Sequence, residues 1–592
     1  MFIKQIQSEI LTYTENKQQI LPSYSFSQYE LVQDIMMFQS NKYYSGNIDS
    51  QKNYKFWTDI IGPRLDSEIK NIDFDTKDII LYSDNPKDST GVFLANSELK
   101  QYLKTTSQAE ILNEAVEQFS AFGNVVFKKV KNGYILWDPL NFYITNLSAR
   151  TLDQTNVIEC QEMNVSELEA HRGIWDNDVL DKVIKECQIK GRATTEKGVR
   201  EDTENIYYKI YERNGNISLY DFKELRGEKI KDNDKEKFIL AKLILAGIGD
   251  GKILKSGNED NKQNEEFYLL YSGKLKKTPY IEAHRGRYQG RWFRTGLYEL
   301  LMDTQIAINY NVNEIRQALE FGAKQIFRSS DTLIAKNILT DMERGDVVKS
   351  SDLQQVMTHF PQINEWVVEY NRLIQLADRL ANSYEVAAGE TMPSGTPFAL
   401  SAMLNQNVNK LYDYIREKLG IALKNVFNEW VVPNLIKEIK VKDILKLTKD
   451  PSYVKRYKDM LVDSWYLNNL LAIGPHSSEI ALMLKQGVRE QLNKKEDFYI
   501  KNEKEFWEDF KATVDVVITG ENVNIQAQNI KYTSFVQLET DPIRRTALIE
   551  KLYAMNGIDV STLPKSTPGQ MQPVNTQSEG MPIIAQSQPQ TI

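Results

Sequence analysis

Residues 293–321 read Phe293-RTGLYELLMDTQIAINYNVNEIRQALE-Phe321. Apolar side chains recur in this stretch at steps of three, four and seven residues, the spacing of one face of an α-helix. They are Leu297, Leu301, Ile308, Val312, Ile315 and Leu319. The other faces carry Asp303, Asn309, Asn313, Glu314 and Gln317. We expect a helix over 293–322 that buries its apolar face and leaves the polar faces to solvent, to a channel or to an adjacent subunit.

Two more long helices are predicted behind the first. The second covers 363–388 after Pro361 and stops at Gly389, which suits the left-handed conformation that closes many helices. The third covers 399–439 and opens with Thr396 as N-cap and Pro397 at the first helical position, where a missing N–H group costs nothing. Its apolar positions are Leu400, Leu404, Val408, Leu411, Ile415, Leu419, Ala422, Val426 and Trp430.

A compact insert, residues 323–362, separates the first two helices. Strands are expected at 325–328 and 346–349, with a short helix over 332–344 between them. Opposite charges balance in the insert, which is typical of a polar docking surface and equally of an ordinary solvated one. The cations are Lys324, Arg328, Lys336, Arg344 and Lys349, and the acids are Asp331, Asp341, Glu343, Asp346 and Asp352.

The first 292 residues predict a mixed α+β region. Helices are expected up to about residue 123 and again over 164–190. Asn132-Gly133, flanked by apolar residues, predicts a hairpin over 127–137, and Asn214-Gly215 predicts a second one over 206–220. Strands are also expected near 237–247 and 267–272. Together with the long helices, this predicts an α+β fold that is mainly helical.

The C-terminal third is less regular. Helical spacing continues after Pro433 to about residue 510, a strand is expected at Val514–Thr519, and a last helix is expected over 541–555. The tail 564–592 is rich in proline and glutamine and has only Lys565 and Glu579 as charged residues. It is therefore expected to be disordered, or to order only on a partner.

Composition argues against several classes of function. The net charge of −8 does not favour a protein whose main work is to grip DNA tightly. There is no apolar run long enough for a membrane span and no signal peptide, so folding in a cytoplasm is expected. Four scattered histidines and two distant cysteines do not predict a zinc site. The segment Gly247–Lys252 has the wrong spacing for a phosphate-binding loop. No catalytic residue, metal or cofactor is predicted.

A basic and aromatic patch precedes the first long helix. Residues 270–294 hold seven Lys or Arg side chains against one acid, Glu282, with aromatic residues between them. Such a patch suits either nucleic-acid contact or a subunit interface. The candidate residues are Arg285, Arg287, Arg291, Trp292 and Arg294.

This arrangement resembles the portal proteins of tailed bacteriophages, which form the head–tail connector ring, and is closest to those of short-tailed, crAss-like phages. The residues that carry the resemblance are Gly286-RYQGRWFRTG-Leu297, Met342-ERGDV-Val348 and Gly389-ETMPSGTPFA-Leu400. By resemblance, the chain divides into a wing (1–292), first stem helix (293–322), clip (323–362), second stem helix (363–388), tunnel loop (389–398), long wing helix (399–439), C-terminal wing or crown (440–563) and tail (564–592).

The resemblance also implies partners and site residues. The protein would form a homo-oligomeric ring of about twelve copies at one capsid vertex, with double-stranded DNA passing through it. The clip residues Lys324, Arg328, Lys336, Arg344, Asp346 and Lys349 would dock the packaging terminase and later the neck or tail adaptor proteins. The major capsid protein would surround the ring. The tunnel loop would approach the DNA through Glu390, Thr391, Met392, Pro393 and Ser394, although an ordinary helix–helix connection would look similar.

Two other functions remain open from the sequence. A nucleic-acid-processing enzyme could assemble a metal site from carboxylates that are scattered along the chain. Another virion structural protein, such as an internal core protein, would also fit the composition.

Overall fold

The computed structural model describes most of the first 450 residues and shorter segments after them. The described ranges are 2–15, 18–43, 46–48, 54–74, 76, 79–83, 89–131, 133–185, 208–248, 266–323, 326–328, 354–356, 363–381, 398–441, 444–446, 458–459, 461–463, 465–466, 469, 478–493, 499–501, 513–516, 533, 535–536, 545, 548–549 and 552. The chain forms two compact units, Met1–Lys449 with Tyr453–Ile518, and Asp450–Ser452 with Thr519–Ile592. All contacts discussed below lie in the first unit.

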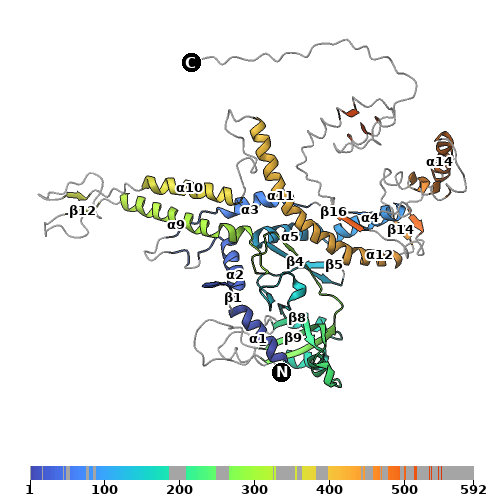
Figure 1. The fold of residues 1–592 in the computed structure, drawn as a ribbon, viewed down its shortest axis with the longest axis horizontal. Coiled ribbons are helices and arrows are strands. Elements are labelled where there is room, and N and C mark those ends of the chain that lie inside the picture. The colour runs from blue at the N-terminus through green and yellow to red at the C-terminus, as the bar shows by residue number, and fades with distance from the viewer. Residues whose placement is uncertain are drawn as a thin grey trace, which may run out of the picture. The chain divides into compact units, whose positions relative to one another are not determined.

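The fold is mixed α+β and mainly helical, as predicted (Figure 1). Its helices are α1 (Phe2–Glu15), α2 (Gln28–Gln39), α3 (Ile61–Ile72), α4 (Ser89–Thr105), α5 (Gln108–Phe122), α6 (Val165–Ala170), α8 (Leu219–Leu225), α9 (Leu297–Ala323), α10 (Ile363–Ala381), α11 (Phe398–Val426), α12 (Val432–Val441) and α14 (Ser478–Asn493). A further helix covers 177–185. In the described part of the chain, no helix has both the length and the hydropathy that a bilayer crossing requires.

The strands form one five-stranded sheet, one three-stranded sheet and four two-stranded pairs in the described residues. The larger sheet has the order β10-β9-β8-β7-β6 and the smaller one β11-β4-β5. The strands are β1 (Gln18–Leu21), β2 (Tyr24–Phe26), β3 (Ile79–Tyr82), β4 (Asn124–Val130), β5 (Gly133–Leu136), β6 (Phe142–Ile144), β7 (Val157–Met163), β8 (Tyr208–Ser218), β9 (Phe238–Ile248), β10 (Glu266–Lys274), β11 (Tyr280–His284), β12 (Ile326–Arg328), β13 (Gln354–Val356), β14 (Ile444–Lys446), β15 (Tyr499–Lys501) and β16 (Thr513–Val516).

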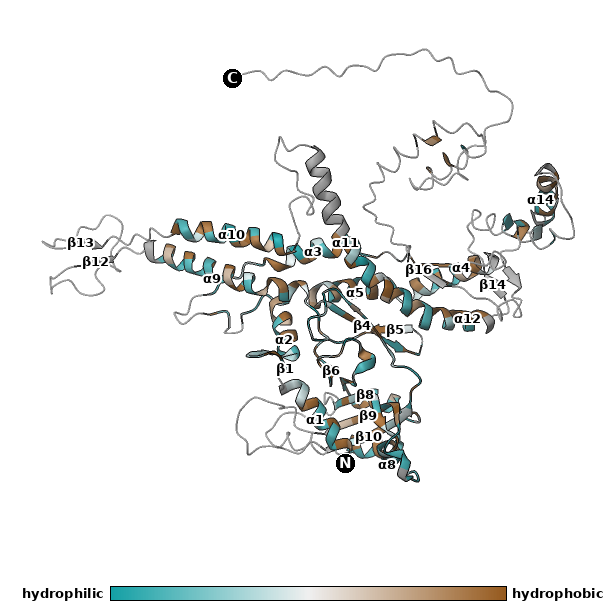
Figure 2. Cartoon of the chain, viewed as in Figure 1, coloured by the Kyte–Doolittle hydropathy of each residue, from teal (hydrophilic) through white to brown (hydrophobic). Residues whose placement is uncertain are grey.

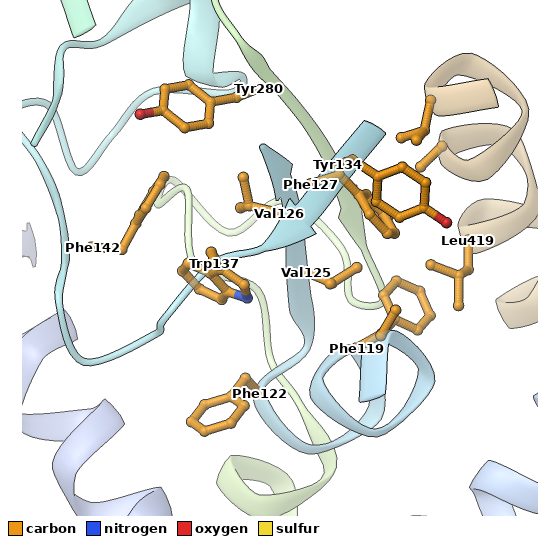
Figure 3. Packing of buried hydrophobic residues seen from close by; sticks show 14 of the residues in the cluster. Phe119, Phe122, Val125, Val126, Phe127, Tyr134, Trp137, Phe142, Tyr280 and Leu419 are labelled. Carbon is orange, nitrogen blue, oxygen red and sulfur yellow. The ribbon is translucent and has the colours of Figure 1, made fainter. Parts of the chain in front are cut away.

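The main hydrophobic core surrounds the β4–β5 hairpin (Figure 3). Phe119 from α5, Phe127 from β4 and Leu419 from α11 are all fully buried there. The hairpin confirms the prediction for 127–137, but its turn is displaced by one residue. Val130 pairs with Gly133, so Gly133 is the first residue of β5 and not a central turn residue.

The second predicted hairpin is wrong. β8 runs without interruption through Asn214 and Gly215 and pairs with β7 on one side and β9 on the other. A Cβ atom at Gly215 would lie 2.2 Å from Oδ1 of Asn156, and this same oxygen accepts a hydrogen bond from the main-chain N–H of Asn216. Gly215 therefore makes room for the Asn156 side chain. Glycine inside a strand can mark such a close approach as well as a turn or bulge.

Two other strand predictions are confirmed, at β9 and β10. The predicted strand near residue 514 is confirmed as β16, which pairs antiparallel with β3, more than 400 positions earlier in the chain. The structure therefore ties the C-terminal part of the first unit to its N-terminal part. The predicted helix 541–555 falls almost wholly outside the described residues, and so does the tail 564–592.

The third long helix is confirmed over 398–441, although Pro433 lies inside it. Proline lacks the N–H group that would bond four residues back, and its ring collides with the carbonyl there. The chain responds with a π-helical turn over Phe427–Val431, where the N–H of Val432 donates to the carbonyl of Phe427 five residues earlier. This local change of register lets α11 continue into α12 as one helical run.

A buried charge network joins the two larger sheets. Lys128 of β4 lies between two carboxylates of the five-stranded sheet, with its Nζ 2.9 Å from Glu159 and 3.0 Å from Glu212. Tyr280 of β11 donates its hydroxyl proton to Glu159. Asn214 donates to the Tyr280 hydroxyl and to Glu212, at 2.7 and 2.8 Å.

The charges in this network control each other's protonation. Burial alone would raise the pKa of Glu212, but the charges of Lys128 and Lys242 outweigh it and lower the pKa to about 2. Burial would likewise lower the pKa of Lys128, and the two carboxylates raise it instead. Burial, reinforced by the carboxylates, raises the pKa of Tyr280 well above its usual value. The network therefore holds Lys128 and Glu212 charged at neutral pH.

Candidate assembly surface

α9 and α10 form an antiparallel helical hairpin (Figure 1). Along α10 the buried residues are Leu373, Ala377 and Ala381, and Asn311 of α9 donates its side-chain N–H to the main-chain carbonyl of Trp366 at 3.2 Å. The two predicted helices are thus confirmed and lie side by side. α9 begins at Leu297, four residues after the predicted start, and α10 is described to Ala381.

Two glycines explain why α9 begins where it does. Gly296 lies against the end of α5, and a Cβ atom there would be 2.3 Å from the carbonyl oxygen of Ala121. Facing it, Gly123 has φ +77°, and its Cβ would be 2.5 Å from the main-chain N of Gly296. The two main chains therefore cross in contact, and neither position has room for a side chain.

Ion pairs hold the base of the hairpin. Arg285 forms a two-pronged pair with Glu68 of α3 at 2.6 and 2.8 Å, and the Glu68 side chain is almost completely buried. Arg64, one helical turn earlier on α3, pairs with Asp378 of α10. Because both partners lie on one face of α3, this helix connects the end of α10 to the segment that leads into α9.

The members of the basic and aromatic patch mostly serve the chain's own core. Arg285 pairs with Glu68, as above; Arg291 pairs with Glu299 and lies over the Phe26 ring. Trp292 is fully buried and donates its indole N–H to Glu282. Arg294 is buried, donates to the carbonyl of Arg291 and stacks on Tyr288. Arg287 is exposed. These contacts are structural, and contact with DNA or another subunit stays a prediction.

Three amide side chains on α9 hold an extended segment of the chain, residues 54–60, which we call the strap. Gln305, Asn309 and Asn313 accept hydrogen bonds from the main-chain N–H groups of Ile60, Thr58 and Phe56, at 2.9, 2.9 and 2.8 Å. The geometry fits because four helical residues rise about 6 Å and two extended residues about 6.6 Å. Each step along the helix therefore meets every second N–H of the strap.

This amide ladder corrects the prediction for the polar faces of α9. Asn309 is buried and Asn313 is hydrogen-bonded to the strap, so neither is left to solvent, a channel or a neighbour. Asp303 and Gln317 are exposed and Glu314 is partly exposed, in line with the prediction. A row of uncharged amides at a spacing of four, beside the apolar face, was the signal in the sequence for a buried polar contact.

Replacing Asn309 with alanine is expected to detach the middle of the strap. The partly buried main-chain N–H of Thr58 would lose its acceptor, which costs up to the roughly 1–3 kcal/mol of a fully buried donor. Hydrogen exchange followed by mass spectrometry should show faster exchange over 54–60 in Asn309→Ala than in the parent chain. Gln317→Ala, at an exposed position of the same helix, should leave this exchange unchanged. Equal exchange in all three proteins would contradict the ladder.

The hairpin exposes apolar side chains that a single copy of the chain does not cover. Ile306 and Tyr310 on α9 have 52% and 68% of their surface exposed, and Val368 on α10 has 68%. Brown, hydrophobic residues alternate with teal, hydrophilic ones along both helices (Figure 2). Leu319, the last residue of the predicted apolar face, is also exposed. Exposed large apolar residues grouped on one element are typical of contact surfaces.

The insert is described only at its two ends. β12 confirms the first predicted strand, and its partner is β13. The second predicted strand, 346–349, and the helix 332–344 lie outside the described residues, as do Lys324, Lys336, Arg344, Asp346 and Lys349. Arg328 is the last residue of β12. The loop residues Glu390, Thr391, Met392, Pro393 and Ser394 also lie outside the described ranges.

A groove of about 610 Å³ lies beside β7. It is lined by the carboxylates Asp138, Glu159, Glu162 and Glu167 and by His171. Glu159 is already bonded to Lys128 and Tyr280, and Glu167 closes the capping box of α6 with Asn164. Among the described residues, no group of three or more His, Cys, Asp and Glu side chains could hold a metal ion.

In comparisons with known proteins, neither a protein-family model nor a curated protein matches this chain.

Proposed function

We propose that this chain is the subunit of a bacteriophage portal, a ring at one capsid vertex through which the genome is packaged and ejected. The observation that carries the proposal is the α9–α10 hairpin: two long antiparallel helices, joined through an insert that begins and ends in the paired strands β12 and β13. The long helical run of α11 and α12 follows in the chain. This is the element order of stem, clip, stem and long helix.

Exposed apolar residues on the hairpin support assembly. The hairpin is anchored firmly at its base by Gly123, Gly296 and the ion pairs of α3, yet Tyr310 and Val368 remain uncovered. Packing of each hairpin against its neighbours would bury these residues and gain the hydrophobic free energy of their burial. Because different surfaces of the hairpin would meet, the contact is head-to-tail and closes as a ring when the rotation between copies is suitable.

In this function the protein works by geometry and not by catalysis. About twelve copies would enclose a channel wide enough for duplex DNA, and a negative net charge would limit adhesion of the DNA to the ring. The clip would receive the packaging terminase and then the neck or tail adaptors, and the capsid protein would contact the outside of the ring. No cofactor is needed for any of these steps.

Negative-stain electron microscopy with mass photometry of the purified chain tests the proposal. The expected result is rings with a central hole and a mass of about twelve chains of 68.4 kDa. Closed rings of another copy number would also support it. A protein that stays monomeric from nanomolar to high micromolar concentration would overturn the proposal.

A further inference from the structure

The strap gives α9 a second surface that the helix alone would not have. Its main chain faces α9 through the amide ladder, while the side chains of Tyr54 and Phe56 are 77% and 49% exposed. Ile306 and Tyr310 each follow a ladder residue by one position, about 100° around α9 from it, so they lie on the exposed face next to the strap. The strap and this neighbouring face of α9 together carry four large, exposed apolar side chains.

The strap and α10 lie on different sides of α9. Asn311 reaches α10, whereas Asn309 and Asn313, two positions before and after it, reach the strap. Residues two positions apart on a helix point in nearly opposite directions. The strap is therefore on the far side of α9 from α10, at one outer edge of the hairpin.

The other outer edge belongs to α10. Val368 lies about 140° around the helix from the buried residue Leu373, and it is exposed. Gln375 and Arg379 are exposed near the same face. The hydrogen bond from Asn311 to Trp366 shows which residues of the two antiparallel helices lie at the same height along the hairpin. Tyr310 and Val368 are close to this bond in sequence, so they lie at nearly the same height.

Charges on the two edges are complementary at a second level. Asp303 is eight residues before Asn311, so it is level with the part of α10 eight residues after Trp366, between Arg372 and Arg379. All three side chains are exposed, and Arg372 also pairs with Glu369 on its own helix. Tyr310 and Val368 can therefore make an apolar contact at one height, and Asp303 can meet Arg372 and Arg379 at another. The two surfaces are complementary at both heights.

We propose that the strap edge, formed by Tyr54, Phe56, Ile306 and Tyr310, receives the outer face of α10 from a second copy of this chain. The inference rests on the proposed ring and adds that an N-terminal segment, outside the stem helices, forms part of the subunit contact. The amide ladder then also contributes to assembly, because it holds Phe56 against α9 at the height where the second copy would make contact.

Disulfide cross-linking tests this contact directly. In a Cys160→Ala, Cys187→Ala background, Tyr310→Cys with Val368→Cys should give a ladder of covalent oligomers under mild oxidation. The control pair, Tyr310→Cys with Leu376→Cys, uses a residue on another face of α10 and should give little cross-linking. Rings seen by electron microscopy without a 310–368 cross-link would overturn the strap contact and leave the proposed function standing. A monomeric parent chain would overturn both.

A second measurement does not depend on cysteine geometry. The ladder uses the main chain of residue 56 and does not involve Tyr310, so Phe56→Ser and Tyr310→Ser should leave the folded monomer intact. Together they should raise the concentration at which rings form by at least tenfold. Ile174→Ser, which changes an equally exposed apolar residue away from the hairpin, should not. Equal assembly of the double variant and the control would overturn the contact.

Discussion

Replacing Lys128 with methionine is expected to destabilise the first unit by about 3–5 kcal/mol, the usual cost of removing one partner from a buried ion pair. Glu159 and Glu212 are directly opposite each other on β7 and β8, a position where like charges repel. Lys128 is the cation that bridges them, and methionine would fill its space without its charge. The loss should appear as a lower midpoint in urea unfolding followed by tryptophan fluorescence.

A control for this prediction lies at the next position. Lys129 is exposed on the same strand. Lys129→Met makes the same substitution outside the buried network, so it should shift the midpoint of urea unfolding only slightly. If the two variants unfold at the same urea concentration, the network does not stabilise the fold as described.

The pH dependence of the Lys128 effect follows from the Glu212 carboxyl. Its pKa is lowered from 4.5 to about 2, so its stabilising contribution is present above pH 4.5 and is lost as the pH falls through 2. Without the charge of Lys128, the buried Glu212 carboxyl is expected to take up a proton at a higher pH, which removes its repulsion with Glu159. The difference in unfolding free energy between the parent chain and Lys128→Met should therefore be smaller at pH 4 than at pH 7. A difference that grows on acidification would contradict this account.

Replacing Gly296 with alanine is the other change with a large expected effect, about 3 kcal/mol or more. The new Cβ would lie 2.3 Å from the Ala121 carbonyl and 2.5 Å from the Gly123 nitrogen, both of them main-chain atoms that cannot rotate away. The start of α9 would have to move off the end of α5, which loosens the base of the hairpin. Thermal unfolding should show a lower midpoint, and ring formation should weaken with it.

The same substitution elsewhere should act in the opposite direction. Gly487 lies inside α14 with nothing within 4 Å of its would-be Cβ, so Gly487→Ala should stabilise that helix by about 1 kcal/mol. Limited proteolysis near α14 would report this gain.

Equal thermal midpoints for Gly296→Ala and the parent chain would contradict the prediction for Gly296, because they would show that its contact with Ala121 and Gly123 is not tight.

Much of the helical part of this protein could be predicted because helix periodicity is local. The apolar spacing of Leu297, Leu301 and Ile308 predicts both a helix and its buried face, and these three side chains are fully buried. The third helix follows the same logic through Leu419 and Val426. Turn signals were less dependable, since the Asn-Gly pair at 132 marks a hairpin and the one at 214 lies inside a strand.

The sequence by itself determined that the segments of α9, α10 and α11 are helices and which faces of them are mainly apolar. Only the tertiary structure decided what the polar residues do. Asn309 meets Thr58 across 251 positions of chain, and Lys128 meets Glu159 and Glu212 from another sheet. Periodicity predicts whether a side chain points inward, but it does not predict which residue that side chain contacts. The contact partners come from elements that are distant in the chain and meet only when those elements pack together.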